Sequence, residues 1–250
     1  MKISLFAERN IKEVLRDPLN LFFGLGFPLV LLVVLSAVNK SIPPEAGNTM
    51  FVIENVAPGL TMFGTAFMAL FAGMLLSKDR TSSFLMRLFA SPMKSVDFIL
   101  GYTLPMLVAA AAQAAITLLA STLFGLGFSW NMLPAIFTTM LSSLLFVGLG
   151  LLFGSFLSEN AAAGICGALL TNLAGWLSGI FIPLTLIGGM FQKSAELLPF
   201  YHSVQATKAT LSGNFSEILP HLAVVLGYTV VIYVLAVIIF RRKMSGDNAG

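Results

Sequence analysis

The chain alternates between long apolar runs and short polar connections. A helix that crosses a membrane needs about 20 mainly apolar residues. The stretch from Leu19 to Val38 meets that length, and five later runs do so as well, at roughly 55–76, 97–124, 133–157, 162–182 and 219–240. The pattern therefore predicts an all-α polytopic membrane protein with six transmembrane helices, built as one membrane domain over residues 1–250.

An amphipathic stretch, residues 1–18, comes before the first apolar run. On a helical projection apolar positions such as Phe6 and Val14 fall on one side and charged positions fall on the other, with Leu5 as the exception. We expect an interfacial helix that ends at Pro18. A signal peptide is the alternative, but its apolar core would span about 7 to 15 residues, and 19–38 lacks a small-residue cleavage site. We therefore expect a retained first span.

Residues 78–92 form the one strongly charged internal connection. As a helix, this stretch would place its large apolar side chains on one face, with two arginines beside that face and Pro92 at its end. The apolar positions are Phe84, Leu85, Leu88 and Phe89, and the arginines are Arg80 and Arg87. Such a helix either lies flat in the headgroup layer or docks on a cytoplasmic partner.

Glycine and proline mark two irregular places in the pattern. The third run carries Gly101 and Pro105 near its start, which predicts a kink or a break whose freed backbone groups are satisfied by neighbouring helices. Between 183 and 218 the apolar pieces are too short to cross a membrane and are interrupted by Pro183, Gly188 and Pro199. We expect re-entrant or short outer helices there, chiefly over 183–213.

The composition agrees with a membrane location, because 57% of the 250 residues are hydrophobic and 10% are charged. Of the 14 Lys and Arg residues, 11 lie in the amino-terminal stretch, the second connection or the carboxyl tail. This bias predicts that both termini and 78–92 face the cytoplasm. The expected location is the plasma (inner) membrane of a bacterium. It also explains the net charge of +3 without a nucleic-acid partner. The single cysteine, Cys166, excludes an intrachain disulfide.

Most site chemistry is absent from the sequence. There is no phosphate-binding loop for ATP, no nucleophile arrangement and no metal-ligand pattern. His202 and His221 are interpreted as solvated or hydrogen-bonded surface histidines. Glu54 and Glu217 are interpreted as carboxylates at span entrances that reach water or cap a helix, with substrate contact as the alternative. No ionisable group falls at a span centre, which weakens a proton-coupled transporter, although neutral oxygens could still bind sodium.

Three polar side chains stand inside the predicted spans. They are Gln113 in span three and the adjacent Thr171 and Asn172 in span five. Hydrogen bonds between helices are the favoured interpretation of such residues, and a contact with a transported molecule in a translocation path is the alternative. Small residues at helical spacing, such as Gly150 and Gly154 in span four, favour close helix packing.

Several short motifs follow the amphipathic first helix, each occurring once and in a definite order along the chain. They are Ala57-Pro58-Gly59-Leu60, Arg87-Leu88-Phe89-Ala90-Ser91-Pro92, Gly179-Ile180-Phe181-Ile182-Pro183-Leu184, Leu198-Pro199-Phe200-Tyr201 and Gly213. In order and spacing the chain resembles the ABC-2 type membrane permeases of ATP-binding-cassette exporters. The resemblance covers nearly its whole length.

The resemblance implies a half-transporter that forms a homodimer or a heterodimer and sits on separate cytoplasmic ABC ATPase subunits. ATP and magnesium would be bound by the ATPase, so this chain would carry no cofactor. The stretch 78–92 would be the coupling helix, which binds the ATPase through Asp79, Arg80, Phe84, Leu85, Arg87, Leu88 and Phe89. The chain departs from the family pattern at Ser83-Phe84-Leu85-Met86, where Gly-Thr-x-Glu is common, and at Lys208, where an arginine is frequent.

The sequence leaves other functions open. A membrane scaffold would use 78–92 to hold a partner without transport, and a sodium-coupled transporter would need no ATPase. An intramembrane enzyme would need convergent polar groups at one depth, which the sequence does not offer. The sequence does not identify the substrate. A path rich in Met and Phe would favour an amphiphilic small molecule or drug, and multidrug efflux is the corresponding activity.

Overall fold

The computed structural model describes residues 2–43, 50–82, 84 and 95–246. Every regular element in these ranges is a helix, which confirms the all-α class predicted from the apolar runs. In chain order the elements are α1 (Lys2–Arg16), α2 (Pro18–Leu21), the π-helical turn η1 (Phe22–Gly26), α3 (Phe27–Ser41), α4 (Ile53–Thr81), α6 (Ser95–Thr122), α7 (Met132–Gly154), α8 (Glu159–Ala163), the π-helical segment η3 (Gly164–Leu170), α9 (Thr171–Leu177), α10 (Leu184–Ile187), α11 (Gly189–Leu197), α12 (Pro199–Leu211) and α13 (Phe215–Gly246).

Five helical stretches of the described chain are long and apolar enough to cross a membrane. They are Phe22–Ser41, Ile53–Thr81, Ser95–Thr122, Met132–Gly154 and Phe215–Lys243. Each contains or overlaps one of the predicted spans. The prediction succeeds because an apolar run of this length in lipid must pair its backbone polar groups within the segment, which a helix does.

The fifth predicted span, 162–182, is not among these five stretches. The backbone is helical from Glu159 to Leu177, through α8, η3 and α9, and then turns at Gly179 with φ +79°. Asn160, Asn172 and several glycines lower the mean hydropathy of this path, and the helix ends before the apolar residues 180–182. The described residues therefore give five candidate spans and a shorter helical path beside α4.

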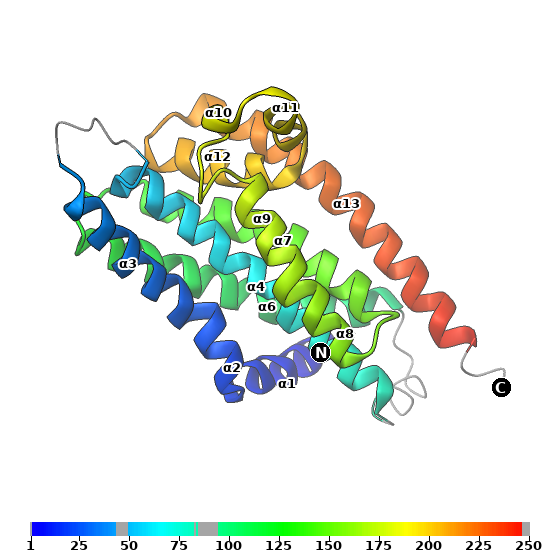
Figure 1. The fold of residues 1–250 in the computed structure, drawn as a ribbon. Coiled ribbons are helices and arrows are strands. Elements are labelled where there is room, and N and C mark those ends of the chain that lie inside the picture. Colours follow the sequence, from blue (N-terminus) through cyan, green and yellow to red (C-terminus); the bar gives the residue numbers. More distant parts are fainter. Residues whose placement is uncertain (1, 44–49, 83, 85–94, 247–250) are drawn as a thin grey trace.

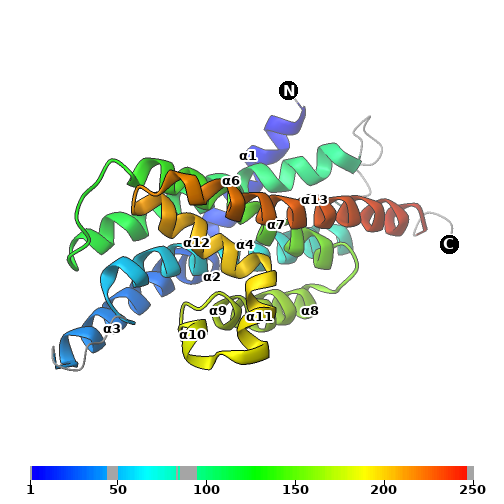
Figure 2. The same ribbon diagram turned by 90° about the horizontal axis from the view of Figure 1, so that it is seen from above.

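Helix α4 is the central element of the bundle (Figures 1 and 2). It packs against α7, α6, α12 and α3, and 89% of its most apolar window is buried. Two glycines of α7 allow the closest approach: a Cβ on Gly150 would lie 2.2 Å from the carbonyl oxygen of Ala69, and a Cβ on Gly154 would lie 2.6 Å from that of Gly73. The α4 and α7 backbones are therefore in direct contact.

Helix α6 continues through Pro105, so the predicted break does not occur. Pro105 has no N–H to donate to the carbonyl of Gly101, one turn earlier. That carbonyl instead accepts a hydrogen bond of 3.0 Å from the Nδ2 of Asn10 on α1. The neighbouring helix thus satisfies the freed backbone group, and α6 stays continuous.

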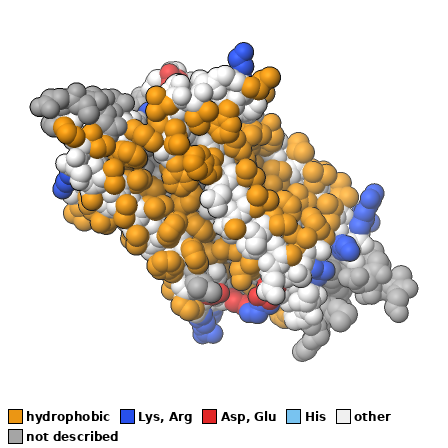
Figure 3. All heavy atoms as spheres, viewed as in Figure 1, with side chains coloured by type: hydrophobic (Ala, Val, Ile, Leu, Met, Phe, Trp, Pro, Cys, Tyr) orange, Lys and Arg blue, Asp and Glu red, His pale blue; other side chains and the backbone are white. Residues whose placement is uncertain are grey.

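Hydrophobic side chains cover most of the molecular face drawn in Figure 3, and charged side chains gather toward its edges. Helix α1 and the carboxyl-terminal part of α13 lie at one end of the bundle, which we call the α1 end (Figure 1). The short helices α10, α11 and α12 lie at the other, the α12 end. This arrangement of an apolar middle with polar ends is the one a bilayer requires.

The two histidines meet at the α12 end. The Nδ1 atoms of His202 on α12 and His221 on α13 are 2.7 Å apart, and both rings are half-buried. One imidazole must donate and the other must accept, so a single proton lies between the two Nδ1 atoms. Of the two predicted interpretations, solvated or hydrogen-bonded surface histidines, the structure shows the second, and the bond joins α12 to α13.

Lowering the pH is expected to weaken this joint. Burial and the nearby His221 lower the pKa of His202 from its ordinary value of 6.5, against smaller opposing effects of Glu196. As the pH falls, the unfolded chain binds this proton before the folded chain does. The contribution of neutral His202 to the free energy of unfolding is therefore fully present above the ordinary pKa and is lost as the pH falls through 6.5 toward the lowered pKa. The thermal midpoint in detergent should fall by a few degrees between about pH 7.5 and about pH 5.5. His202→Gln should show a smaller fall, and an equal fall would contradict this assignment.

Candidate functional site

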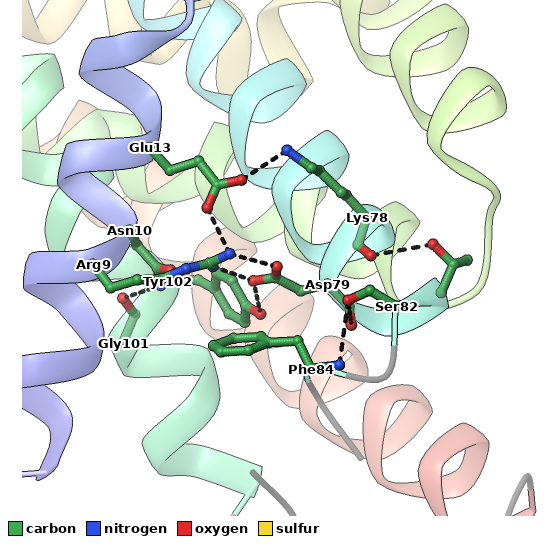
Figure 4. Close-up of polar contacts among 10 residues, drawn as sticks. Arg9, Asn10, Glu13, Lys78, Asp79, Ser82, Phe84, Gly101 and Tyr102 are labelled. Atoms are coloured by element: carbon green, nitrogen blue, oxygen red, sulfur yellow. Dashed lines mark hydrogen bonds and ion pairs between the residues drawn. The ribbon is translucent and has the colours of Figure 1, made fainter. Parts of the chain in front are cut away.

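Asp79 stands on the last turn of α4, at the α1 end of the bundle. Its side chain is only 3% exposed. Its carboxylate accepts two hydrogen bonds from the guanidinium of Arg9 on α1, at 2.5 and 2.8 Å, and a third of 2.8 Å from the hydroxyl of Tyr102 on α6 (Figure 4). One buried carboxylate thus joins three helices that are distant in sequence.

Further charges extend this contact along α1 and α4. Glu13 pairs with Arg9 at 2.5 Å and with Lys78 at 2.8 Å. Two cations and two anions therefore balance within one cluster, which we call the Asp79 cluster: Arg9, Asn10, Glu13, Lys78, Asp79 and Tyr102. A bidentate guanidinium–carboxylate pair fixes both the distance and the orientation of the two helices.

The protonation state of Arg9 follows from these partners. Partial burial lowers the pKa of its guanidinium, but the hydrogen bonds and negative charge of Asp79, together with Glu13, outweigh burial and raise that pKa above its ordinary value. Arg9 is therefore permanently charged, and the cluster cannot act as a proton relay through it. Its role is to hold the helices in place.

Asn10 links the cluster to the proline turn of α6. Its side chain is fully buried, donates to the carbonyl of Gly101 and accepts a 2.8 Å hydrogen bond from Arg9. A Cβ on Gly101 would lie 2.3 Å from the ring of Phe6, so α1 sits directly against the α6 backbone. Gly101 thus leaves space for Phe6, and Pro105 leaves free the carbonyl that Asn10 bonds, so both residues of α6 allow α1 to pack there.

Aromatic rings support the same junction. Phe6 is buried and packs edge-on against Tyr102 and Phe98, with ring centroids 5.0 and 6.0 Å away. It also stacks on Phe84 at 6.4 Å, and the guanidinium of Arg9 lies 4.4 Å above the Phe84 ring. Helix α1 therefore contacts the chain immediately after α4 as well as α4 itself.

The opposite side of the α4 terminus binds the connection between α7 and α8. The carbonyl of Leu157 accepts a 2.9 Å hydrogen bond from Ser77 and a 2.6 Å hydrogen bond from Arg80. The last two turns of α4 are thus held by α1, by α6 and by the 155–158 connection. Any displacement of this terminus must be shared by all three.

The structure places part of the predicted 78–92 helix. Lys78, Asp79 and Arg80 belong to α4, which continues to Thr81, and Ser82 is extended with ψ 156°. The boundary predicted at residue 78 is therefore too early. Asp79 and Arg80 point into the bundle contacts described above, and Phe84 packs on α1. Leu85, Arg87, Leu88 and Phe89 lie outside the described residues.

The three polar residues predicted inside the spans do not share a contact. Gln113 is fully buried, donates to Thr117 at 3.0 Å within α6, and has no described partner for its Oε1. Thr171 is buried and donates to the carbonyl of Cys166, and Asn172 is exposed and donates to that of Ala168. Each of these hydrogen bonds stays within its own helical path, α6 for Gln113 and Glu159–Leu177 for the other two, so none of the three joins two packed helices.

Sequence reasoning missed four members of the cluster: Arg9, Asn10, Glu13 and Tyr102. A signal was present, because Asp79 is a single carboxylate at the end of a long apolar run and a buried carboxylate requires a cationic partner. The sequence does not say which of the many basic residues supplies it. That choice depends on where α1 docks.

The cluster has no chemistry of its own beyond hydrogen bonding and charge. Its carboxylates are committed to basic partners and its hydroxyl to a carboxylate, so it presents no free nucleophile or base. Within the described residues no group of three or more His, Cys, Asp or Glu side chains could hold a metal ion. The arrangement is a mechanical junction rather than an active site.

The fold and this junction define the class: a multi-pass helical membrane protein whose central helix is clamped at one end by a buried charged cluster. A family model described as ABC-2 type transporter matches residues 1–212 of the 250. The chain therefore belongs to the ABC-2 type transporter family and forms the membrane permease part of an ABC transporter, as its motifs predict. This family associates with an ABC ATPase and with the membrane. No curated protein matches the chain.

Proposed function

We propose that this chain is the permease subunit of an ABC exporter and moves an amphiphilic small molecule out of the cell with ATP hydrolysed by a separate subunit. Two copies, or this chain and a related one, would form the transmembrane pathway above two ATPase subunits. The observation that supports this proposal is the Asp79 cluster, which holds the end of α4, where the 82–94 segment begins, against α1 and α6. In the family, that segment is where the ATPase binds.

The junction suggests how force from an ATPase would reach the spans. Phe84 is held against α1 by Phe6 and Arg9, a short distance along the chain from Asp79. A push on the 82–94 segment would therefore move the ends of α1, α4 and α6 together. Because α4 packs directly on α7, the same movement would pass into the centre of the bundle.

The double change Leu85→Asp and Leu88→Asp is expected to abolish ATPase binding while the protein still inserts. The reason is that two carboxylates replace the proposed apolar anchors in the segment that follows α4. The measurement is a mild-detergent pull-down from native membranes with mass spectrometry of the bound proteins. Leu5→Asp is a matched control, since Leu5 is 63% exposed on α1. Equal recovery of an ATPase by all three proteins would contradict the anchor assignment.

We also propose a six-span topology in which the path Glu159–Leu177 is the remaining span and both termini are cytoplasmic. Its continuous helical backbone beside α4 supports this, as does the basic character of the α1 end. In a Cys166→Ala background, Ser194→Cys on α11 should react with an impermeant maleimide added to intact cells. Ser158→Cys and Glu8→Cys should react only after lysis. Outside labelling of either of these two would overturn the topology.

A further inference from the structure

A polar cavity of about 270 Å³ lies at the α12 end of the bundle, at the opposite end from the Asp79 cluster. Its walls come from the start of α4, the connection between α9 and α10, and the helices α11 and α12. The lining residues used below are Asn55, Thr185, Glu196, Tyr201, Gln205 and Lys208. None of them belongs to the proposed coupling junction.

Among the described residues that line this cavity, Lys208 is the one cation and Glu196 the one anion. The Nζ of Lys208 donates to the Oδ1 of Asn55 at 2.6 Å, which uses one of the three ammonium protons. The Oε1 of Glu196 accepts from the Nε2 of Gln192 at 2.7 Å, which leaves the other carboxylate oxygen able to accept more. A ligand that carries both a negative and a positive group matches this pair of charges.

Neutral hydrogen-bonding groups in the cavity are also uncommitted. Tyr201, Gln205 and Thr185 line it, and their side chains make no hydrogen bond to any residue that the structure describes. Ser178, also in the lining, instead donates to the carbonyl of Gly175. Groups that face a cavity and have no hydrogen-bond partner in the described part of the chain are available to a ligand with several polar atoms.

Large apolar side chains are exposed on the same short helices, outside the cavity lining; Leu186 follows the lining residue Thr185 in the chain, and Leu197 follows Glu196. Leu186 on α10 is 73% exposed, Met190 on α11 is 79% exposed and Leu197 on α11 is 72% exposed. Leu184, in the same turn as Leu186, is buried and forms part of the cavity wall. A polar hollow beside an exposed apolar surface fits a molecule with a polar head and an apolar tail.

We propose that this cavity binds the zwitterionic headgroup of a phosphoamine amphiphile, with its phosphate at Lys208, its amine at Glu196 and its tail on the apolar side chains of α10 and α11. A volume of about 270 Å³, roughly nine water molecules at about 30 Å³ each, is large enough for a headgroup. The proposal requires a membrane location and is independent of export and of ATPase binding.

The test is native mass spectrometry of the purified full chain in a neutral detergent. Three probes are titrated: a short-chain phosphatidylethanolamine, the matching phosphatidylglycerol and free phosphoethanolamine. Phosphatidylethanolamine should bind at least tenfold more tightly than either of the other two, because only this probe carries both charges and a tail. If free phosphoethanolamine binds as tightly as the lipid, the amphiphile assignment is wrong, and if phosphatidylglycerol binds as tightly, the role of Glu196 is wrong.

Two variants separate the charges. Lys208→Met should weaken binding of both lipids at least tenfold, whereas Glu196→Gln should weaken only phosphatidylethanolamine. Lys193→Met is the matched control, since Lys193 is exposed on α11 outside the lining, and it should bind as wild type does. Unchanged phosphatidylethanolamine binding by Glu196→Gln and Lys208→Met would overturn the proposal, whatever the outcome of the ATPase pull-down.

Discussion

Asp79→Asn is expected to loosen α1 and the α4 terminus and to uncouple the permease from its ATPase. The amide keeps the size of the carboxylate but loses its charge, and Arg9 then retains only Glu13 as an anionic partner. Removing one partner of a buried pair costs about 3–5 kcal/mol, and we expect roughly 2–4 kcal/mol here because Arg9 is one-third exposed. The thermal midpoint in detergent should fall by roughly 5–15 °C.

The matched control is Glu8→Gln on the same helix. Glu8 pairs with Lys12 at 2.6 Å, and both side chains are more than half exposed, so this change should alter the midpoint by less than about 2 °C. The Asp79→Asn variant should still pull down the ATPase. ATP hydrolysis by that ATPase should no longer drive movement of the spans in the Asp79→Asn variant, measured as nucleotide-dependent changes in tryptic cleavage between the predicted helices.

A double-mutant cycle assigns the effect to the pair. Arg9→Gln should destabilise the protein by an amount similar to that of Asp79→Asn, and the double variant should cost clearly less than their sum. Additive costs would show that Asp79 acts mainly through Tyr102, whose hydroxyl bonds the same carboxylate. An unchanged midpoint in both single variants would contradict the structural role of the cluster.

Gly150→Ala is expected to prevent recovery of a stably folded protein. The added methyl group would lie 2.2 Å from the carbonyl oxygen of Ala69 and 2.8 Å from its Cα, so α4 and α7 must separate by roughly 1 Å. Both partners are backbone atoms that cannot rotate away. We expect a loss of about 3 kcal/mol or more, measured as a lower thermal midpoint and a lower yield of monodisperse protein.

Gly227→Ala on α13 provides the comparison. A Cβ at Gly227 meets no atom within 4 Å, and its backbone is helical with no positive φ. Alanine should therefore stabilise this helix by about 0.5–1 kcal/mol. If Gly150→Ala is tolerated as well as Gly227→Ala, then α4 and α7 do not pack as closely as described.

The spans were predictable where run length alone decides the outcome. Five runs of membrane length became five candidate spans, since an apolar helix of that length has one stable environment. Run 162–182 was harder to assign because its polar and glycine positions weaken the signal and its last residues leave the helix. The expected break at Pro105 does not occur, and the carbonyl that the proline leaves free is satisfied by a neighbouring helix as predicted, through Asn10 of α1.

The Asp79 cluster could not be derived from one sequence. Helical periodicity shows that α1 has an apolar face, but it does not show that Phe6 docks on Gly101 or that Arg9 reaches Asp79. Arg9 and Asp79 are 70 positions apart in the chain, and Asn10 and Gly101, which are bonded at the same junction, are 91 positions apart. Periodicity also assigned Asp79 and Arg80 to a separate helix, because it cannot tell where a transmembrane helix ends and a polar connection begins.

Hydrogen exchange of the protein in lipid nanodiscs tests the central claim most directly. If the Asp79 cluster clamps α1 to α4 and α6, the amides of Lys2–Arg16 and of the last turn of α4 should be well protected in the wild type. Asp79→Asn should then raise exchange in both segments at least tenfold, while α12 and the start of α13 stay unchanged. Fast exchange of α1 in the wild type, unaffected by Asp79→Asn, would instead show an interfacial helix that floats free of the bundle and would contradict the account.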